Sequence, residues 1–108
     1  METDAKKWGL TSSVLNRMRT ILTRYPQVST ATLFGSRAKG NFKPESDIDV
    51  CLAGNELTFR TMLSIGSALN ALELPQKIDL VLRNLVDNPE LLNEIDSTGA
   101  VFYQLDQT

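Results

Sequence analysis

The stretch VSTATLFGSRAKGNFKPESDIDVCLAG, residues 28–54, decides the fold. Its first seven residues are rich in β-branched and aromatic side chains and stop at Gly35, which predicts a strand. The middle contains two glycines, a proline and two serines, and this composition is typical of a turn or loop. From Asp47 to Leu52 polar and apolar residues alternate, so the stretch ends in a second strand with one apolar face.

The flanking sequence supplies the rest of a small α+β domain. Apolar side chains spaced three and four apart predict helices over residues 10–25 and 59–72, and KIDLVLR (residues 77–83) repeats the alternation of a strand. A third helix is expected from Asn88-Pro89 to a stop at Gly99. The tail 101–105 carries enough apolar surface for a short edge strand or a contact with a partner. We therefore predict one α+β domain over residues 1–108.

Composition excludes several kinds of chemistry. The chain of 108 residues contains no histidine and one cysteine, Cys51. Catalysis by a Ser-His-Asp or Cys-His set, His-ligated zinc and an internal disulfide are therefore excluded. The formal net charge of -2 argues against a general nucleic-acid-binding surface.

The same sequence predicts a cytoplasmic protein without a membrane partner. No segment approaches the roughly 20 apolar residues that span a bilayer. The opening METDAKKWGL lacks the basic and then apolar pattern of a signal peptide. The single cysteine is compatible with a reducing compartment.

Three aspartates are candidate metal ligands. Asp47 and Asp49 project from the same face of a strand, about 6.5–7 Å apart along it. Asp79 has the equivalent place in the KIDLVLR strand, so all three carboxylates converge if the two strands are neighbours. Such clustered anions need compensating cations. Oxygen ligands without His or Cys select Mg²⁺ first and Mn²⁺ second.

The Gly35-Ser36 turn is a candidate phosphate site. Glycine lets the backbone approach a phosphate, and N–H groups at a strand-to-helix turn bind anions. Residues 35–46 contain three basic side chains, Arg37, Lys39 and Lys43, against one acidic side chain, a local charge of +2. A basic turn beside three carboxylates is the pattern of a metal–triphosphate site.

These features together resemble the DNA polymerase beta-like nucleotidyltransferase superfamily. The resemblance rests on Phe34-Gly35-Ser36, ten intervening residues, Asp47-Ile48-Asp49 and the later Asp79. It spans residues 28–83, about half of the chain. The wording of residues 35–40 and the small size are most similar to the minimal nucleotidyltransferases, the antitoxins of the HEPN/minimal-nucleotidyltransferase toxin–antitoxin pairs.

The resemblance implies a fold, a reaction and a role for each site residue. It implies a mixed sheet with helices packed on one face, two Mg²⁺ ions, and transfer of AMP from ATP to a tyrosine of a HEPN toxin. Asp47 and Asp49 match the pair that holds both metals, and Asp79 matches the third carboxylate of the catalytic metal. Gly35 and Ser36 match the triphosphate-holding pair, and Arg37 and Lys39 are expected phosphate contacts.

Two other functions fit the same residues. One is an antitoxin that binds nucleotide or toxin and neutralises by occlusion, without catalysis. The other is a metal-dependent phosphohydrolase. Isolated Gly-Ser and Asp-x-Asp pairs are common in turns and at strand ends, so the joint pattern, rather than any single piece, carries the prediction.

Overall fold

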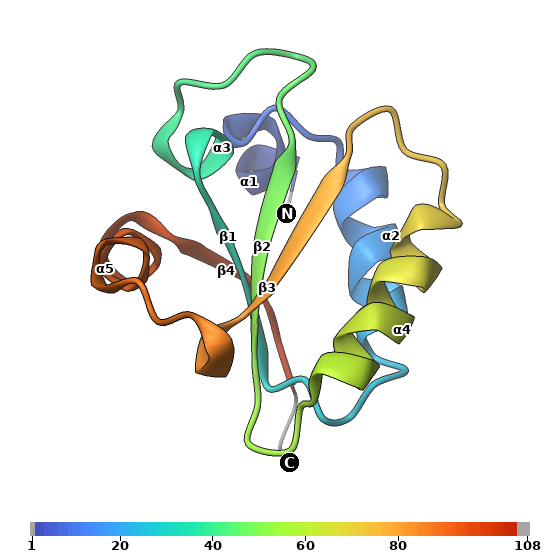
Figure 1. The fold of residues 1–108 in the computed structure, drawn as a ribbon. Coiled ribbons are helices and arrows are strands. Elements are labelled where there is room, and N and C mark those ends of the chain that lie inside the picture. Colours follow the sequence, from blue (N-terminus) through green and yellow to red (C-terminus); the bar gives the residue numbers. More distant parts are fainter. Residues whose placement is uncertain (1, 106–108) are drawn as a thin grey trace.

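The structure, a computed structural model, describes residues 2–105 as an α+β fold built on one mixed sheet (Figure 1). The element order confirms the predicted fold class. In chain order the elements are α1 (Glu2–Lys7), α2 (Ser12–Leu22), β1 (Thr30–Phe34), α3 (Ser36–Lys39), β2 (Ile48–Ala53), α4 (Phe59–Asn70), β3 (Ile78–Leu82), the 3-10 turn η1 (Arg83–Leu85), α5 (Pro89–Thr98) and β4 (Ala100–Gln104).

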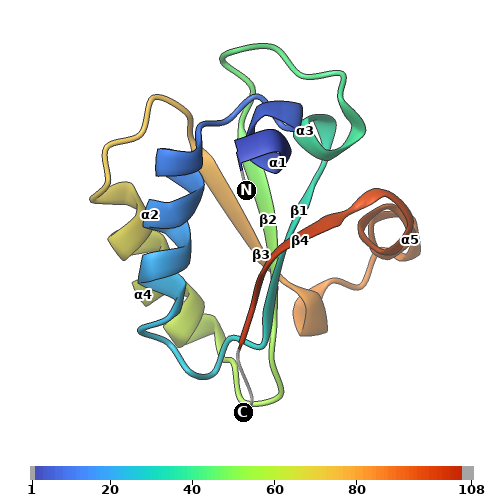
Figure 2. The same cartoon turned by 180° about the vertical axis from the view of Figure 1, so that it is seen from behind.

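The sheet has the strand order β3-β2-β1-β4. β1 runs antiparallel to both β2 and β4, whereas β2 and β3 are parallel. The tail predicted as an edge strand or a partner contact is the edge strand β4, which pairs with β1 (Figure 2). β3 forms the opposite edge, and the crossover through α4 makes the parallel β2–β3 pair possible.

Helix starts follow local capping chemistry. The Thr11 hydroxyl accepts a hydrogen bond from Val14 N at the start of α2, and Thr58 caps α4 in the same way. At α5, Asn88 accepts from the backbone while Pro89 occupies the first turn. The sequence did not predict α1, whose short and charged segment has weak helical periodicity; the buried side chains of Ala5 and Trp8 hold it against the core.

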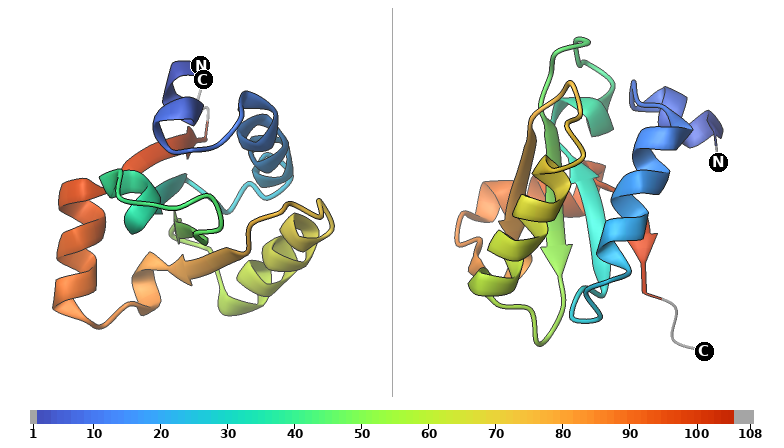
Figure 3. Two further views of the ribbon diagram at one scale, coloured as in Figure 1. Left: turned by 90° about the horizontal axis from the view of Figure 1, so that it is seen from above. Right: turned by 90° about the vertical axis from the view of Figure 1, so that its right-hand side faces the viewer.

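Helices cover both faces of the sheet, as the view from above in Figure 3 shows. The α2 and α4 face holds the main core, which includes Leu33, Ile48, Val50, Leu52, Leu15, Met18, Leu22, Ile65 and Leu69. The other face carries a smaller cluster under α5, made by Phe34, Cys51 and Ile95 with Val81 and Leu91 packed against it. The one-sided packing expected from the resemblance therefore describes α2 and α4, and α5 adds a second layer.

None of the helices in the described part of the chain has the length and apolar character needed to cross a membrane.

Candidate active site

Strands β2 and β3 place two of the predicted carboxylates side by side. Asp49 and Asp79 are Cα partners in the parallel ladder, and the backbone bond from Ile48 N to Lys77 O, 2.8 Å, fixes this register at its start. Adjacent strands lie about 4.8 Å apart and partners in register point to the same face. The condition stated from the sequence, that these strands be neighbours, is met.

Asp47 lies one residue before β2 and is exposed. Burial raises the pKa of the Asp49 carboxyl above its usual range, and the nearby charges of Asp79, Asp47 and Glu94 raise it further. Asp47 and Asp79 therefore act electrostatically on Asp49. A positively charged ligand would relieve that repulsion.

Glu94, on α5, is a residue that sequence reasoning missed. Its charge acts on Asp49, and its Oε1 lies 3.2 Å from Lys39 Nζ. The only sequence signal was an acidic residue beside the apolar stripe of a helix, and such residues are usually solvated. Nothing in the sequence placed α5 over the carboxylate face.

The turn after β1 faces the same carboxylates. Phe34 pairs with Asp49 in the antiparallel ladder, so Gly35 begins the turn next to that side chain. Gly35 adopts φ 77° and ψ -153°, a region that only glycine populates readily. A Cβ on Gly35 would overlap with Asp49 Oδ2, so the glycine is required by both backbone conformation and space.

Ser36 opens the short helix α3 immediately after Gly35. Ser36 is partly exposed, at the end of the sheet where Asp47 and Asp49 lie. The first N–H groups of a helix have no partner within the helix, and they can donate to an anion. Ser36 and the start of α3 thus stand where the sequence expected a phosphate to bind.

Arg37 does not occupy the place expected of a phosphate ligand. Its side chain is only 1% exposed, and its guanidinium donates hydrogen bonds to backbone carbonyls on two separate segments. The acceptors are the carbonyl oxygens of Trp8, Gly9, Lys43, Pro44 and Ser46. Arg37 also lies over the Phe42 ring, with 5.1 Å from Cζ to the ring centroid. It therefore fastens the loop that leads to Asp47 onto the N-terminal segment, which is a structural role.

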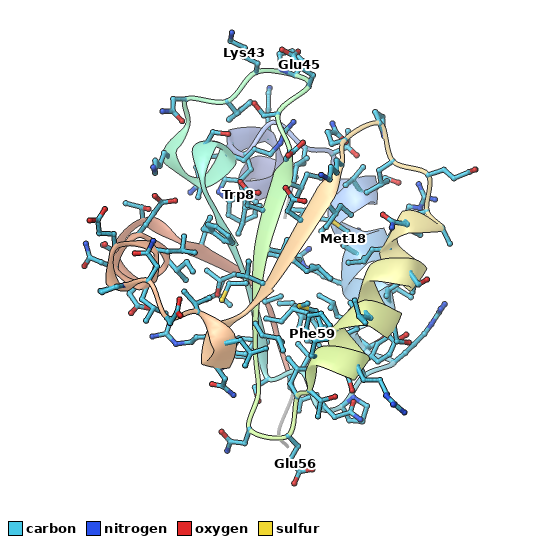
Figure 4. All side chains as sticks on the ribbon, viewed as in Figure 1. Trp8, Met18, Lys43, Glu45, Glu56 and Phe59 are labelled. Carbon is cyan, nitrogen blue, oxygen red and sulfur yellow. The ribbon has the colours of Figure 1, made fainter. Side chains whose placement is uncertain are left out.

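The two lysines lie differently. Lys39 is paired with Glu94 at the surface, and its side chain is accessible. Lys43 lies on the loop between α3 and β2. Figure 4 shows its side chain, with that of Glu45, at the outer tip of this loop, at the top of the view. Of the three basic residues in residues 35–46, only Lys39 remains a candidate for phosphate.

The carboxylates do not form a closed metal cage. Among the side chains that the structure describes, those of residues 5–105, no three acidic, cysteine or histidine side chains are already grouped as metal ligands. Asp79 Oδ1 instead pairs with Lys77 Nζ at 3.5 Å, and both side chains are substantially exposed. The donor set nevertheless consists of carboxylate oxygens with mutually repelling charges. It fits a hard divalent cation that retains water and shares substrate oxygens.

Comparison with known proteins places this geometry in a family. Residues 16–108 match the family described as "Polymerase beta, Nucleotidyltransferase". A Methanocaldococcus jannaschii protein named "Putative protein adenylyltransferase MJ1379" is 29% identical over 85 residues, which cover 77% of this chain and 85% of that protein.

Two solved structures have the same fold. One, a toxin–antitoxin with AMP-PNP, aligns with a TM-score of 0.68 at 23% identity and covers 86% of this chain and 75% of that chain. The other is a tri-AMPylated Shewanella oneidensis HEPN toxin in complex with an MNT antitoxin. It aligns with a TM-score of 0.64 at 20% identity over 86% of this chain and 71% of that chain.

The family match covers most of the chain, including the Gly35-Ser36 turn and the three aspartates. The chain therefore belongs to the polymerase beta nucleotidyltransferase family.

Proposed function

We propose that this nucleotidyltransferase moves AMP from ATP to a hydroxyl, the tyrosine hydroxyl of a HEPN-type toxin, and so acts as an antitoxin. The observation that carries the proposal is the register of Asp49 with Asp79 beside the Gly35 turn. It gives a carboxylate set and a phosphate-binding turn on one face of the sheet. The adenylyltransferase name of one relative and the AMP-PNP and AMPylated-toxin complexes of two structural neighbours support the nucleotide and the acceptor.

Asp47, Asp49 and Asp79 would hold two Mg²⁺ ions. When bound, these ions neutralise the triphosphate and stabilise the charge that develops on the leaving pyrophosphate. Mn²⁺ satisfies the same oxygen ligands. Lys77 is paired with Asp79 in the structure. Lys77 would therefore have to release this carboxylate for Asp79 to hold an ion.

The side chains of the protein position the reactants. The Gly35 backbone and the Ser36 hydroxyl bind the β- and γ-phosphates, and Lys39, at the end of the same short helix, is an accessible cation for the triphosphate. Asp79 accepts the proton of the attacking hydroxyl. The hydroxyl oxygen then bonds to the α-phosphorus, the bond between the α- and β-phosphates breaks, and pyrophosphate leaves with the electron pair.

The test is transfer of label to a defined acceptor. We would incubate the chain with ATP labelled at the α-phosphate, Mg²⁺ and a purified HEPN-type toxin. We expect label on the toxin with one pyrophosphate released per AMP transferred. Loss of label in an Asp47→Asn variant, with retention in Asp87→Asn on an exposed loop, would tie transfer to the site.

Other outcomes distinguish the competing functions. A chain that transfers no label, but protects cells equally well as wild type and as an Asp47→Asn/Asp49→Asn double variant, acts by occlusion. Free AMP or inorganic phosphate released without an acceptor identifies a phosphohydrolase. Either result contradicts the proposed transfer.

A further inference from the structure

Strand β3 is an edge strand whose outer side is open. It pairs with β2 in the described part of the sheet and has no second strand neighbour there. Lys77 O accepts a hydrogen bond from Ile48 N, so the backbone groups of Lys77 point toward β2. In a strand, the N–H and C=O of one residue point to one side, and those of the next residue point to the other side. The N–H and C=O groups of Ile78 and Leu80 therefore point away from β2. These are the donors and acceptors that an added strand uses.

A groove lined by apolar side chains and by the polar residues Ser67 and Asn70 runs beside that edge. It lies between α4 and β3, has a volume of about 330 Å³, and is lined by Met62, Leu63, Gly66, Ile78 and Leu80, among others. Within this lining the Leu63 side chain is 57% exposed. A strand beside β3 would place every second side chain in this groove.

The other face of the same strand is the active-site face. Lys77 and Asp79 alternate with the groove residues, so the remaining side chains of an added strand would lie beside these two. The backbone N–H and C=O of Asp79 point toward β2. A residue opposite Asp79 in an added antiparallel strand would therefore form a non-hydrogen-bonded pair, in which Cα atoms are about 4.5 Å apart.

Given the proposed AMP transfer, on which this inference rests, we propose that the acceptor polypeptide docks as an extended strand on the free edge of β3, with its hydroxyl side chain opposite Asp79. Charge complementarity specifies the segment further. The Lys77 side chain is 73% exposed and lies two residues from Asp79, so an acidic residue two positions from the hydroxyl residue would pair with it. The intervening residue enters the groove on its β3 side, which Ile78 and Leu80 form, so it is apolar.

Amide hydrogen exchange measured by NMR on the full chain tests this docking. In the free protein the outward N–H groups of Ile78 and Leu80 exchange quickly, whereas those of Asp79 and Val81, directed toward β2, are protected. Addition of the purified HEPN-type toxin should slow exchange at Ile78 and Leu80 at least about ten-fold and leave the other two unchanged.

The outcomes separate this inference from the proposed function. Transfer of AMP without protection at Ile78 and Leu80 overturns the strand docking and leaves the activity in place. Protection without transfer retains the docking and overturns the activity. Absence of protection and of transfer overturns the docking and the activity together. Protection that grows with the concentration of this chain alone, without toxin, overturns the docking of an acceptor and assigns the edge to a second copy.

Matched variants test the same edge by kinetics. Leu80→Pro removes the outward N–H, and Leu80→Ala removes the same side chain but retains the donor. We expect the KM for the toxin to rise at least about five-fold more in the proline variant, with the KM for ATP unchanged. Equal KM values in the two variants would contradict the docking.

A second pair covers the case in which Leu80→Pro does not fold. A Cβ on Gly66 would meet only Leu80 Cδ1, at 3.7 Å, so Gly66→Ala is tolerated and Gly66→Leu fills the groove. The leucine variant should weaken toxin binding at least about five-fold relative to the alanine variant. Unchanged binding would show that the groove is not used.

Discussion

The two faces of strand β2 differ in what they contribute. Ile48, Val50 and Leu52, at most 1% exposed, face α2 and α4 and belong to the main core. On the other face Asp49 is half-buried among like charges while Cys51 is buried under α5. One face thus stabilises the fold, and the other holds charge that the fold alone does not favour. Such a separation is common where a site is built on a rigid sheet.

Removal of the Asp49 charge should show this separation most clearly. Asp49→Asn is expected to lower AMP transfer by about 10³-fold, because a metal ligand contributes several kcal/mol to the transition state. Burial and neighbouring anions disfavour the ionised carboxyl in the folded chain, so the same variant should unfold at equal or slightly higher denaturant concentration in chelator.

Asp96→Asn, an Asp→Asn change at an exposed position of α5, is the control and should retain transfer. Loss of both activity and stability in Asp49→Asn would contradict the division between the two faces.

Truncation on the core face should have the opposite signature. Leu52→Ala is expected to lower the free energy of unfolding by about 3 kcal/mol, since Leu52 is fully buried. The remaining folded protein should keep its KM for ATP. Leu85→Ala, at a side chain that is 62% exposed, should change the unfolding midpoint in urea very little. Similar losses in the two variants would mean that the main core is elsewhere.

A comparison of two glycine variants tests the close approach of Gly35 to Asp49. Gly35→Ala adds a Cβ that overlaps with Asp49, whereas Gly40→Ala, at φ 90°, meets nothing within 4 Å. Both carry the strain of a positive φ, about 1–2 kcal/mol. We therefore expect Gly35→Ala to lose more stability than Gly40→Ala, because it adds the overlap with Asp49, and to show a further 10- to 100-fold loss of transfer. Transfer assays on the two purified variants check this prediction. Equal activities would show that the close approach of Gly35 to Asp49 is not needed for transfer.

The smallest effect is expected at the surface pair Arg83–Asp96, with 2.6 Å between Nη1 and Oδ1. The hydrogen bond from Arg83 lowers the pKa of the Asp96 carboxyl. A depressed folded-state pKa stabilises the protein above the ordinary carboxyl pKa, and this contribution disappears as pH falls through the folded-state value. Thermal unfolding of wild type and Asp96→Asn should therefore differ slightly at pH 7 and converge as the pH falls below the ordinary range of a carboxyl pKa. A difference that grows on acidification would contradict this origin.

Local patterns were sufficient for most of the fold. The alternation in residues 47–52 and 77–83 predicted β2 and β3, and Asn88-Pro89 predicted the start of α5. The segment that failed was α1, because a short charged helix depends on the burial of Trp8 by distant residues. The order of residue types likewise selected the Gly35-Ser36 turn and the three aspartates as candidate site residues, which stay predictions, and it did not select Glu94.

Arg37 shows the limit of reading charge from sequence. From the sequence alone, a basic residue next to a candidate phosphate-binding turn is expected to bind phosphate. Only the packed structure shows that the guanidinium of Arg37 donates to five backbone carbonyls. Long cationic side chains can satisfy buried carbonyls or solvent-exposed anions with the same chemistry. Burial decides between them.

The sequence by itself determined which residue types this protein can use: carboxylates, a glycine turn and no histidine, in strands whose alternation sends one set of side chains to each face. Period and composition are local properties, so they survive without knowledge of the fold. Only the tertiary structure decided that Asp79 lies beside Asp49, that α5 brings Glu94 to them, that Arg37 is structural, and that the edge of β3 is open. Each of these depends on which segments distant in the chain are packed together.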